Sequence, residues 1–491
     1  MMTRFTFKLL PVAMALSLSA CAVGPDYQAP SMTLAETYLN AEHSEQATQD
    51  LWWQSLGDET LNQLVTQLQQ QNIHLKTAAE RIQMANAYQT IVESFKVPTV
   101  NVGAGYYNYQ FSKNDSALAP ILNPLGQSVP GLDNIAPGLG SMTLMDNQHD
   151  GFALGANLSW ELDLFGRIDK QSEAAKIRVE QAEIYREGLN LALTADLIHN
   201  YLQYRGAHER KQLALENIED QKKTLKLVTS VVNSGYGSAL DQSQAEAMLA
   251  ATQAIIPQLE IAEQVHKHRM AILLGVPLTQ IDTQLATHQD VPELQGLIPV
   301  GLPSELLTRR PDIRIAERDM AAINEELGAA MANRYPKFFI TGTPGVSAGS
   351  FDDLFKSDSF GWAGSAGVSW NVFDGGRGKA NVEIQESRLN NAALRYEHTV
   401  NSAIAEVDST LFAYGRSQQN RDQIDIAMQA TDRALDKAKS LYRAGLIDYI
   451  ALLDAQRQHR VMQDRQVAAK LQTAQATVAV YKSLGGDWSV Q

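Results

Sequence analysis

Two long stretches of helical pattern without proline most constrain the fold of this 491-residue chain. The first follows Gly166-Arg167 and extends to about Val232, and the second extends from about Lys379 to Arg443. In both, apolar residues recur at steps of seven, which is typical of helices that pack along their length at shallow angles. At about 1.5 Å per residue, about 65 residues form a rod about 100 Å long. The sequence therefore predicts two such rods.

Each rod is followed by a glycine and then at once by a second helical pattern. Gly235 and Gly445 can adopt the left-handed conformation that ends a helix, and Ser238 or Asp448 can cap the helix that follows. Each glycine therefore marks the predicted tip of a long αα-hairpin, where we expect the moving part of the molecule. The two glycines lie 210 positions apart, and the same offset relates Trp160 to Trp370, Arg167 to Arg377 and Tyr204 to Tyr414. Four pairs at one offset indicate an internal duplication.

The sequence before each rod has a period of two residues instead. From Phe152 to Leu162, and again from Phe360 to Val372, mostly apolar or aromatic residues alternate with small or polar ones. This pattern fits a strand with one side toward lipid, as in outer-membrane barrels. A soluble amphipathic hairpin would show the same alternation, so both interpretations are open at this point.

The first twenty residues have the pattern of an export signal. Arg4 and Lys8 lead into an apolar run, Leu9 to Leu18, which is too short to span a membrane. The run ends in Leu18-Ser-Ala-Cys21, which resembles a bacterial lipobox, and this implies cleavage before Cys21 and covalent lipid on that residue. The alternative is an ordinary signal peptide with a chance cysteine. No other stretch is long and apolar enough for a membrane-spanning helix, so any spanning part would be β.

Composition and motifs argue against several other classes of protein. The net charge of −14 disfavours nucleic acid and anionic membrane surfaces as partners. Cys21 is the only cysteine, so neither a disulfide framework nor a cysteine metal site is expected. His266 and His268 do not share a helix face, and Gly103-Ala-Gly105 lacks the setting of a nucleotide-binding loop. We therefore expect no catalytic residue, no metal and no cofactor apart from the lipid on Cys21.

The strand pattern also sets a requirement on assembly. Four predicted strands are too few to close a membrane barrel, and open sheet edges cannot face lipid. Because closed membrane barrels have at least about eight strands, the barrel must be shared between copies of the chain. Two copies would give about eight strands and three would give about twelve.

Motifs spread over the whole mature chain are similar to those of one family. They are the lipobox, Trp52-Trp53, Phe165-Gly-Arg167, Leu302-Pro-Ser-Glu-Leu-Leu-Thr-Arg-Arg-Pro-Asp-Ile313, Tyr442-x-x-Gly445, Leu453-Asp-Ala-Gln-Arg457 and Leu484-Gly-Gly486. In these motifs the chain resembles the outer-membrane factor family, the tripartite efflux duct proteins of Gram-negative bacteria, which includes NodT-type lipoproteins and TolC. The resemblance implies an α+β membrane protein. It would be a homotrimer with a twelve-stranded outer-membrane β-barrel, four strands per chain, continued by a long α-helical periplasmic barrel.

The resemblance also implies a function and partners. The chain would be a lipid-anchored outer-membrane channel of a tripartite efflux system, conducting drugs or other small toxic compounds to the exterior. Its expected partners are two further copies of itself, a periplasmic adaptor (membrane fusion) protein, an inner-membrane efflux pump of RND type and outer-membrane lipid, with no nucleic acid. Two alternatives stay open, an outer-membrane duct for type I protein secretion and a non-conducting lipid-anchored coiled-coil spacer.

The expected organisation follows the duplication. Residues 1–20 form the signal peptide, 21–58 an N-terminal extended and equatorial segment, 59–277 the first repeat, 278–302 an equatorial linker, 303–485 the second repeat and 486–491 the C-terminal tail. Each repeat would contain a helix, a β-hairpin (97–164 or 337–373) and a long helical hairpin. The helices before the β-hairpins are expected at about 59–95 and 303–334, and the stretch 279–297 is expected to be irregular.

In relatives the periplasmic end of the helical barrel is closed by polar links between helices. The resemblance implies that some positions of this chain correspond to the residues that form those links. Tyr442 and Asp241 match a latching hydrogen bond, while Ile447 replaces the basic residue of the family's latch salt bridge. Asp454 matches one of two acidic rings, and Ala451 occupies the position of the other. The plainer alternatives are that Asp241 caps its helix together with Ser238 and that Asp454 lies on a solvated surface.

Overall fold

The computed structural model describes residues 23–32, 34–40, 51–110, 112, 148–286, 290–292, 298 and 300–486. The signal peptide and Cys21 lie outside the described residues. The chain forms two compact units, which are described separately below. The first contains residues 87–175 and 323–387 together with the N-terminal segment to Tyr27, and the second contains the rest. Within the described ranges, no helix combines the length and the apolar character needed to cross a membrane.

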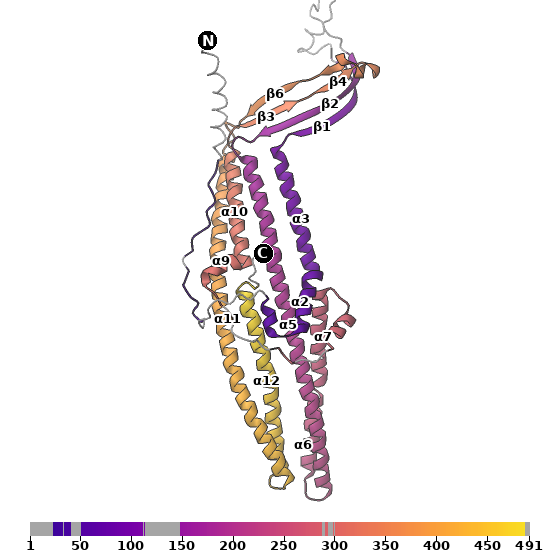
Figure 1. The fold of residues 1–491 in the computed structure, drawn as a ribbon, viewed down its shortest axis with the longest axis vertical. Coiled ribbons are helices and arrows are strands. Elements are labelled where there is room, and N and C mark those ends of the chain that lie inside the picture. Colours follow the sequence, from indigo (N-terminus) through magenta and orange to yellow (C-terminus); the bar gives the residue numbers. More distant parts are fainter. Residues whose placement is uncertain are drawn as a thin grey trace, which may run out of the picture. The chain divides into compact units, whose positions relative to one another are not determined.

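The first unit is built on an antiparallel sheet (Figure 1). Its strands are β1 (Thr99–Gln110), β2 (Gln148–Leu162), β3 (Lys337–Gly342), β4 (Gly345–Ala348), β5 (Phe360–Gly361) and β6 (Gly364–Ser369). Strand β2 pairs with β1 on one side and with both β3 and β4 on the other, and these pair in turn with β6 and β5. Pro344, which cannot donate to the ladder, lies between β3 and β4, so these two are segments of one interrupted strand. The sheet therefore has the two predicted hairpins side by side.

The register divides the sheet into two chemically different faces. Val102 lies opposite Ala156, and Phe338 lies opposite Val368, all on one face. On the other face, Thr341 contacts Ser365 with 2.7 Å between the hydroxyl oxygens. Val102 and Val368 are 75% and 62% exposed. The predicted separation of apolar and polar faces is confirmed, and the apolar face is open.

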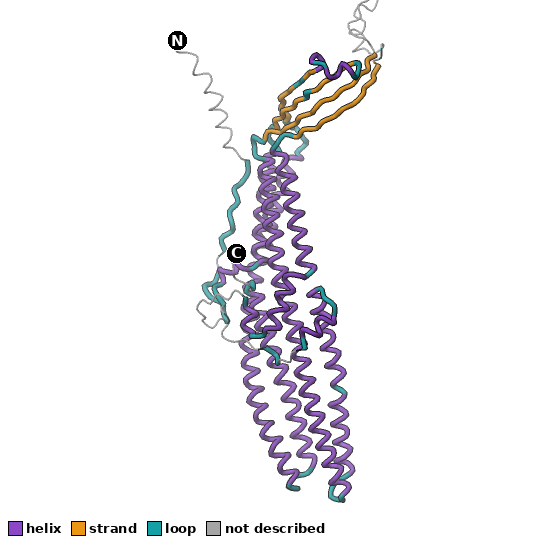
Figure 2. The backbone as a smooth tube through the Cα atoms, turned by 45° about the vertical axis from the view of Figure 1, so that its right-hand side comes forward, coloured by secondary structure: helices purple, strands orange, loops and turns teal. Residues whose placement is uncertain are grey.

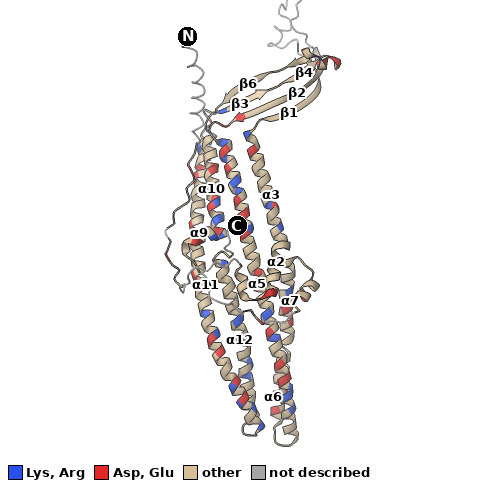
Figure 3. Cartoon of the chain, viewed as in Figure 1, with Lys and Arg blue, Asp and Glu red and all other residues tan. Residues whose placement is uncertain are grey.

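Charged residues are confined to the ends of these strands. In the described strands they are Asp150 and Glu161 near the two ends of β2 and Lys337 at the first position of β3. Figure 3 shows the stretches between them in tan, without acidic or basic colour. The middle of the sheet is therefore uncharged on both faces.

The second unit is helical (Figure 2). Its helices are α2 (Glu59–Gln71), α6 (Ala239–Gln253), α7 (Ile256–Leu274), α8 (Leu278–Gln284), α9 (Leu306–Arg309) and α12 (Tyr449–Ser483). Four helices contribute residues to both units, and these are α3 (Ile73–Glu93), α5 (Arg167–Asn233), α10 (Pro311–Ala332) and α11 (Arg377–Arg443). Helices α5 and α11 are the predicted rods.

The two rods match each other in several features, as the predicted duplication expects. Helices α5 and α11 each contain 67 residues. Arg167 and Arg377, the first residues of the two, are related by the offset found in the sequence. The indole nitrogens of Trp160 and Trp370 donate to the carbonyl oxygens of Lys96 and Arg334, at 3.0 Å in both cases. The two halves therefore share the length of their rods and the contacts that join strand to helix.

Three boundaries differ from the sequence prediction. The helix expected at 59–95 is interrupted at Asn72, whose buried side chain donates to the Leu273 carbonyl at 2.7 Å and accepts from the amide of His74 at 2.8 Å. The helix expected at 303–334 is interrupted at Arg310, because a residue before proline disfavours helical geometry. The stretch expected to be irregular at 279–297 contains most of α8, anchored by the fully buried Ile281.

The core of the second unit is organised around the N-terminal aromatic residues. Trp52 is buried and stacks on Tyr481, with ring centroids 4.8 Å apart. Beside it, the buried carboxylate of Asp58 caps α2 and accepts from the hydroxyl of Tyr201 at 2.5 Å. That hydroxyl accepts in turn from the buried guanidinium of Arg205. Burial of a charge is tolerated when it is paired and hydrogen-bonded, as it is here.

The Tyr201 hydroxyl joins two buried charged groups, so its removal should be costly. We expect Tyr201→Phe to lower the free energy of unfolding by about 1–3 kcal/mol, because Asp58 and Arg205 each lose a buried partner. Thermal unfolding in detergent, followed by the helical circular dichroism signal, measures the change. Tyr236→Phe, at a 90% exposed tyrosine, is the matched control and should leave the midpoint unchanged. Equal midpoints for both variants would contradict a bridging role for Tyr201.

Candidate gate at the hairpin tips

The two hairpin tips have the same backbone structure. Gly235 and Gly445 have left-handed φ values of 84° and 72°. At each tip the glycine amide donates to a carbonyl three residues earlier, and the next amide donates to a carbonyl five residues earlier. These paired bonds form the motif that commonly ends a helix at a glycine, because only glycine adopts this conformation without a steric penalty. The long helices therefore end at equivalent points in the two repeats.

Side-chain caps start the returning helices. Ser238 accepts from the amide of Leu240 at 3.1 Å, and the Asp241 carboxylate accepts from the Ser238 amide at 3.2 Å. This reciprocal arrangement is a capping box. In the second repeat Asp448 accepts from the amide of Ala451 at 2.9 Å. Asp241 is therefore engaged by its own helix, as the plainer interpretation of the sequence expects.

Tyr442 lies in the last turn of α11. It is half-buried and packs edge-on against Tyr449, with ring centroids 6.0 Å apart. Burial, and then the negative charge of Asp241, raise the pKa of the Tyr442 hydroxyl. In the described part of the chain no hydrogen bond joins Tyr442 to Asp241. The structure thus brings the two expected latch residues near each other but does not join them.

A small apolar core lies beneath the tips and unites the two hairpins. Its buried members come from α5, α6, α11 and α12, and they are Val228, Ala245, Met248, Leu435, Tyr449, Leu452 and Leu453. Tyr442 packs against this cluster. Polar contacts also link the two hairpins, from Lys439 to Asp220 and from Gln456 to Thr224, both at 3.2 Å. Apolar burial therefore holds the tips together, with polar contacts around it.

Outside this core the tips carry exposed apolar side chains at equivalent positions. Tyr236 and Leu446, one residue after each glycine, are 90% and 71% exposed. Leu240 and Ile450, in the first turns of the returning helices, are also exposed. Asp454 lies one turn further along α12, where it is exposed and accepts from the Gln458 amide nitrogen at 2.7 Å. Asp454 therefore lies on the exposed surface of this chain, bonded to its own helix.

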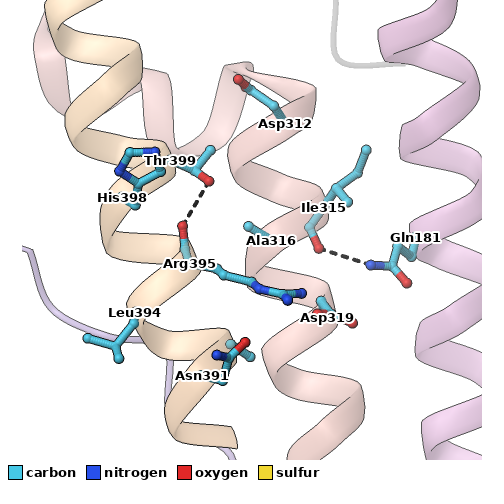
Figure 4. Close-up of a pocket in the computed structure, with 11 residues that line it drawn as sticks. Gln181, Asp312, Ile315, Ala316, Asp319, Asn391, Leu394, Arg395, His398 and Thr399 are labelled. Carbon is cyan, nitrogen blue, oxygen red and sulfur yellow. Dashed lines mark hydrogen bonds between the residues drawn. The ribbon is translucent and has the colours of Figure 1, made fainter. Parts of the chain in front are cut away.

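A cavity in the second unit was not foreseen from the sequence. It has a volume of about 620 Å³ and is lined by residues of α5, α10 and α11 (Figure 4). Figure 4 shows Arg395 extending from α11 toward Asp319 on α10. Asp319 also pairs with Arg178, and Asp312 pairs with Arg310. The Asp319 pair links α10 to α5, whereas Asp312 pairs with a residue two positions away in the chain. The cavity is lined by three helices that are far apart in the sequence, so the sequence gives no local signal for it.

His266, one of the two histidines near each other in the sequence, contacts a polar side chain of α5. The Nδ1 atom of His266 lies 3.0 Å from the side-chain oxygen of Asn200. Burial, together with His199 and Arg269, lowers the pKa of His266 and keeps its ring neutral over a wider pH range. Among the described residues, no three His, Cys, Asp or Glu side chains are placed to hold a metal ion together.

Comparison with known proteins covers almost the entire chain. A family model described as "Outer membrane efflux protein" matches residues 64–276 and 302–486. Nodulation protein T of Rhizobium leguminosarum bv. viciae is 28% identical, over 99% of this chain and 94% of its own length. Outer membrane protein OprJ of Pseudomonas aeruginosa is also 28% identical, over 99% of this chain and 97% of its own. The solved structure of the outer-membrane channel OprN is similar with a TM-score of 0.83 and 32% identity, covering 95% of this chain and 99% of that one.

Tyr449 provides a pH test of the packing at the tips. Burial, and then Tyr442 and Asp241, raise the pKa of its hydroxyl to about 12. Since the folded state favours the neutral phenol, this stabilisation is fully present below about pH 10, the unfolded value, and is lost as the pH rises toward 12. Between these values the stability of the wild type relative to Tyr449→Phe should fall by up to about 1.4 kcal/mol per pH unit. Unfolding midpoints of both proteins across this range measure it, and a constant difference would contradict the expectation.

Proposed function

The chain belongs to the outer membrane efflux protein family and is an efflux channel of the Gram-negative outer membrane, and we propose that it is the outer duct of a tripartite pump. In this role it conducts drugs or other small toxic compounds from a periplasmic adaptor protein and an inner-membrane pump to the exterior. One observation carries the proposal. The sheet of the first unit has an exposed apolar face, a small and polar opposite face, and no charge in its middle.

The sheet supports a shared barrel because it is incomplete in one chain. Strand β1 forms one edge, and β5 and β6 form the other, so both edges have unpaired backbone groups. In lipid such groups must be paired, which happens when copies of the sheet join edge to edge. Three copies, each with four strand lines, give a twelve-stranded barrel wide enough for a polar lumen. The apolar face then contacts lipid and the polar face lines the channel.

Exposed apolar side chains on the helices support the same homotrimer. On α3 and just beyond it, Tyr88, Ile91 and Phe95 are exposed at spacings of three and four residues and so share one helix face. In the second unit, Leu394, Phe412 and Ile426 are exposed on α11. Apolar stripes of this kind are favourable when another helix covers them. Neighbouring copies would provide that cover and complete a helical tube in the periplasm.

The hairpin tips form the proposed gate of this tube and the docking end for the adaptor. The exposed apolar pairs Tyr236 and Leu446, and Leu240 and Ile450, offer the adaptor a repeated surface. Tyr442 and Asp241 form the proposed latch in the closed trimer, without a salt bridge at Ile447. Asp454 from three copies forms one acidic ring that favours cations. Lipid on Cys21 anchors each copy to the membrane.

The latch can be separated from helix capping by a matched set of variants. We expect Tyr442→Phe combined with Asp241→Ala to raise single-channel conductance severalfold in planar bilayers, because the closed tips lose their polar link. Asp241 also belongs to the capping box, so Ser238→Ala is the control that weakens the cap and keeps the carboxylate. Its conductance should stay at the wild-type value. A rise in the control alone, or no rise in the double variant, would contradict the latch.

The function itself has a direct test against its two alternatives. A strain without the gene should become several times more sensitive to small toxic compounds and should keep its set of secreted proteins. Loss of one exported protein with unchanged sensitivity would favour a type I secretion duct instead. The purified protein should migrate as a heat-resistant trimer on gels and conduct ions. A stable single-copy species that does not conduct would favour the coiled-coil spacer.

A further inference from the structure

The two points where the sheet meets the long helices differ in charge, although they are equivalent by duplication. In the first repeat each cation has an acidic partner within the chain. Lys96 pairs with Asp169 at 2.7 Å, and Arg167 pairs with Glu161 at 2.9 Å. This junction is therefore locally neutral.

The second repeat keeps the cations and replaces both acids. Arg377 is equivalent to Arg167 by the 210-residue offset. Arg334 is equivalent to Lys96 by contact, because the carbonyl oxygen of Lys96 accepts from Trp160 and that of Arg334 accepts from Trp370. At the 210-residue offset, Asn371 replaces Glu161 and Lys379 replaces Asp169. We call Arg334, Trp370, Arg377 and Lys379 the basic junction.

The cations of the basic junction come from two adjoining segments of the chain. A Cβ atom on Gly378 would lie 3.4 Å from Cγ of Arg334, so the Arg334 side chain lies against the first turn of α11, the turn that also carries Arg377 and Lys379. The first turn of α11 contains no acidic residue, whereas that of α5 contains Asp169. Since the start of a helix carries partial positive charge, cations there are unfavourable unless an anion lies nearby.

The acidic groups of the chain near this junction compensate only in part. Asp374 accepts from the amides of Gly376 and Gly378, and these bonds together with Arg377 lower the pKa of its carboxyl. The Nε atom of Arg377 donates to the carbonyl oxygen of Asp374 at 3.2 Å. Glu383 lies 3.5 Å from Lys379, but both side chains are mostly exposed, and such pairs contribute little. The three cations are thus accompanied by two carboxylates, that of Asp374, which accepts from backbone amides, and the exposed one of Glu383.

Aromatic and apolar side chains adjoin the cations at the end of the uncharged strands. Trp370 is 56% exposed, and Phe373 is 92% exposed. The Trp370 indole N–H is already bonded, so the ring offers its apolar surface. Tryptophan with adjacent cations is the combination that proteins place at the level of lipid headgroups, where basic side chains attract anionic phospholipids.

From this arrangement we infer that the basic junction binds the phosphate group of an anionic phospholipid in the periplasmic leaflet, with the acyl chains against Trp370 and Phe373. The overall negative charge of the protein does not oppose this, because the attraction is local and screened beyond about 10 Å. The inference rests on the proposed insertion of the sheet in lipid. The first junction has its own acids and so does not bind lipid in this way.

Exchanging the acids between the repeats tests the inference. Native mass spectrometry of the purified protein in detergent, with phosphatidylglycerol or phosphatidylcholine added, counts the bound lipids. We expect wild type to retain phosphatidylglycerol in preference to phosphatidylcholine, and Asn371→Glu combined with Lys379→Asp to weaken that binding at least tenfold. The reciprocal change, Glu161→Asn combined with Asp169→Lys, should add a second phosphatidylglycerol per chain. Circular dichroism confirms that each variant is folded.

Three results would overturn the inference. They are unchanged phosphatidylglycerol binding in the Asn371→Glu, Lys379→Asp variant, equal binding of the two lipids by wild type, and complete displacement by millimolar inorganic phosphate, which would indicate a free phosphate site. Failure of the proposed channel would appear separately as absent conductance, because lipid binding in detergent does not require a pore.

Discussion

Unpaired backbone groups at the two edges of the sheet are the constraint on which the rest of this structure depends. A membrane offers no water to satisfy them, so a sheet with an apolar face can be inserted only when its edges are paired. The chain supplies the apolar face, the uncharged middle and the small polar face, but only four strand lines. In the proposed channel the pairing comes from further copies, and the assembly of the helices follows from the assembly of the strands.

Duplication explains how one chain supplies both a regular wall and an irregular gate. The two long helices have the same length and both end at a glycine, so they can occupy equivalent positions in the wall of a helical barrel. Substitutions after the duplication then distinguish the halves where regularity is not required. Asp241 corresponds to Ala451 at the tips, and Asp169 corresponds to Lys379 near the sheet. The backbone plan is conserved between the halves while the chemistry at its two ends has diverged.

The sequence predicted what depends on local pattern and missed what depends on distant partners. Period-two strands, long heptad helices and glycine tips follow from neighbouring residues, and the structure has all of them. The break at Asn72 was missed, because it is fixed by the carbonyl of Leu273, about two hundred residues away. The Asp58–Tyr201–Arg205 network and the cavity beside Arg395 were invisible for the same reason. At the candidate gate, the sequence left two roles open for Asp241, and the structure shows its carboxylate in the capping box, near Tyr442 but not bonded to it.

The contacts beneath the tips determine what opening must cost. Ion pairs and amide contacts between the hairpins, such as that of Lys439 with Asp220, are partly exposed and contribute at most about 1 kcal/mol each. Each large apolar side chain withdrawn from the shared cluster would lose about 1.5–3 kcal/mol of burial, so separating the hairpins at Leu452 and Leu453 is far more costly. Opening is therefore cheapest if the cluster moves as one body, or if a partner covers the apolar side chains that the motion exposes. Tyr236 and Leu446 are already exposed at the tips, so binding them alone would not favour opening. The proposed adaptor lowers the cost of opening only if it also covers side chains that the motion exposes.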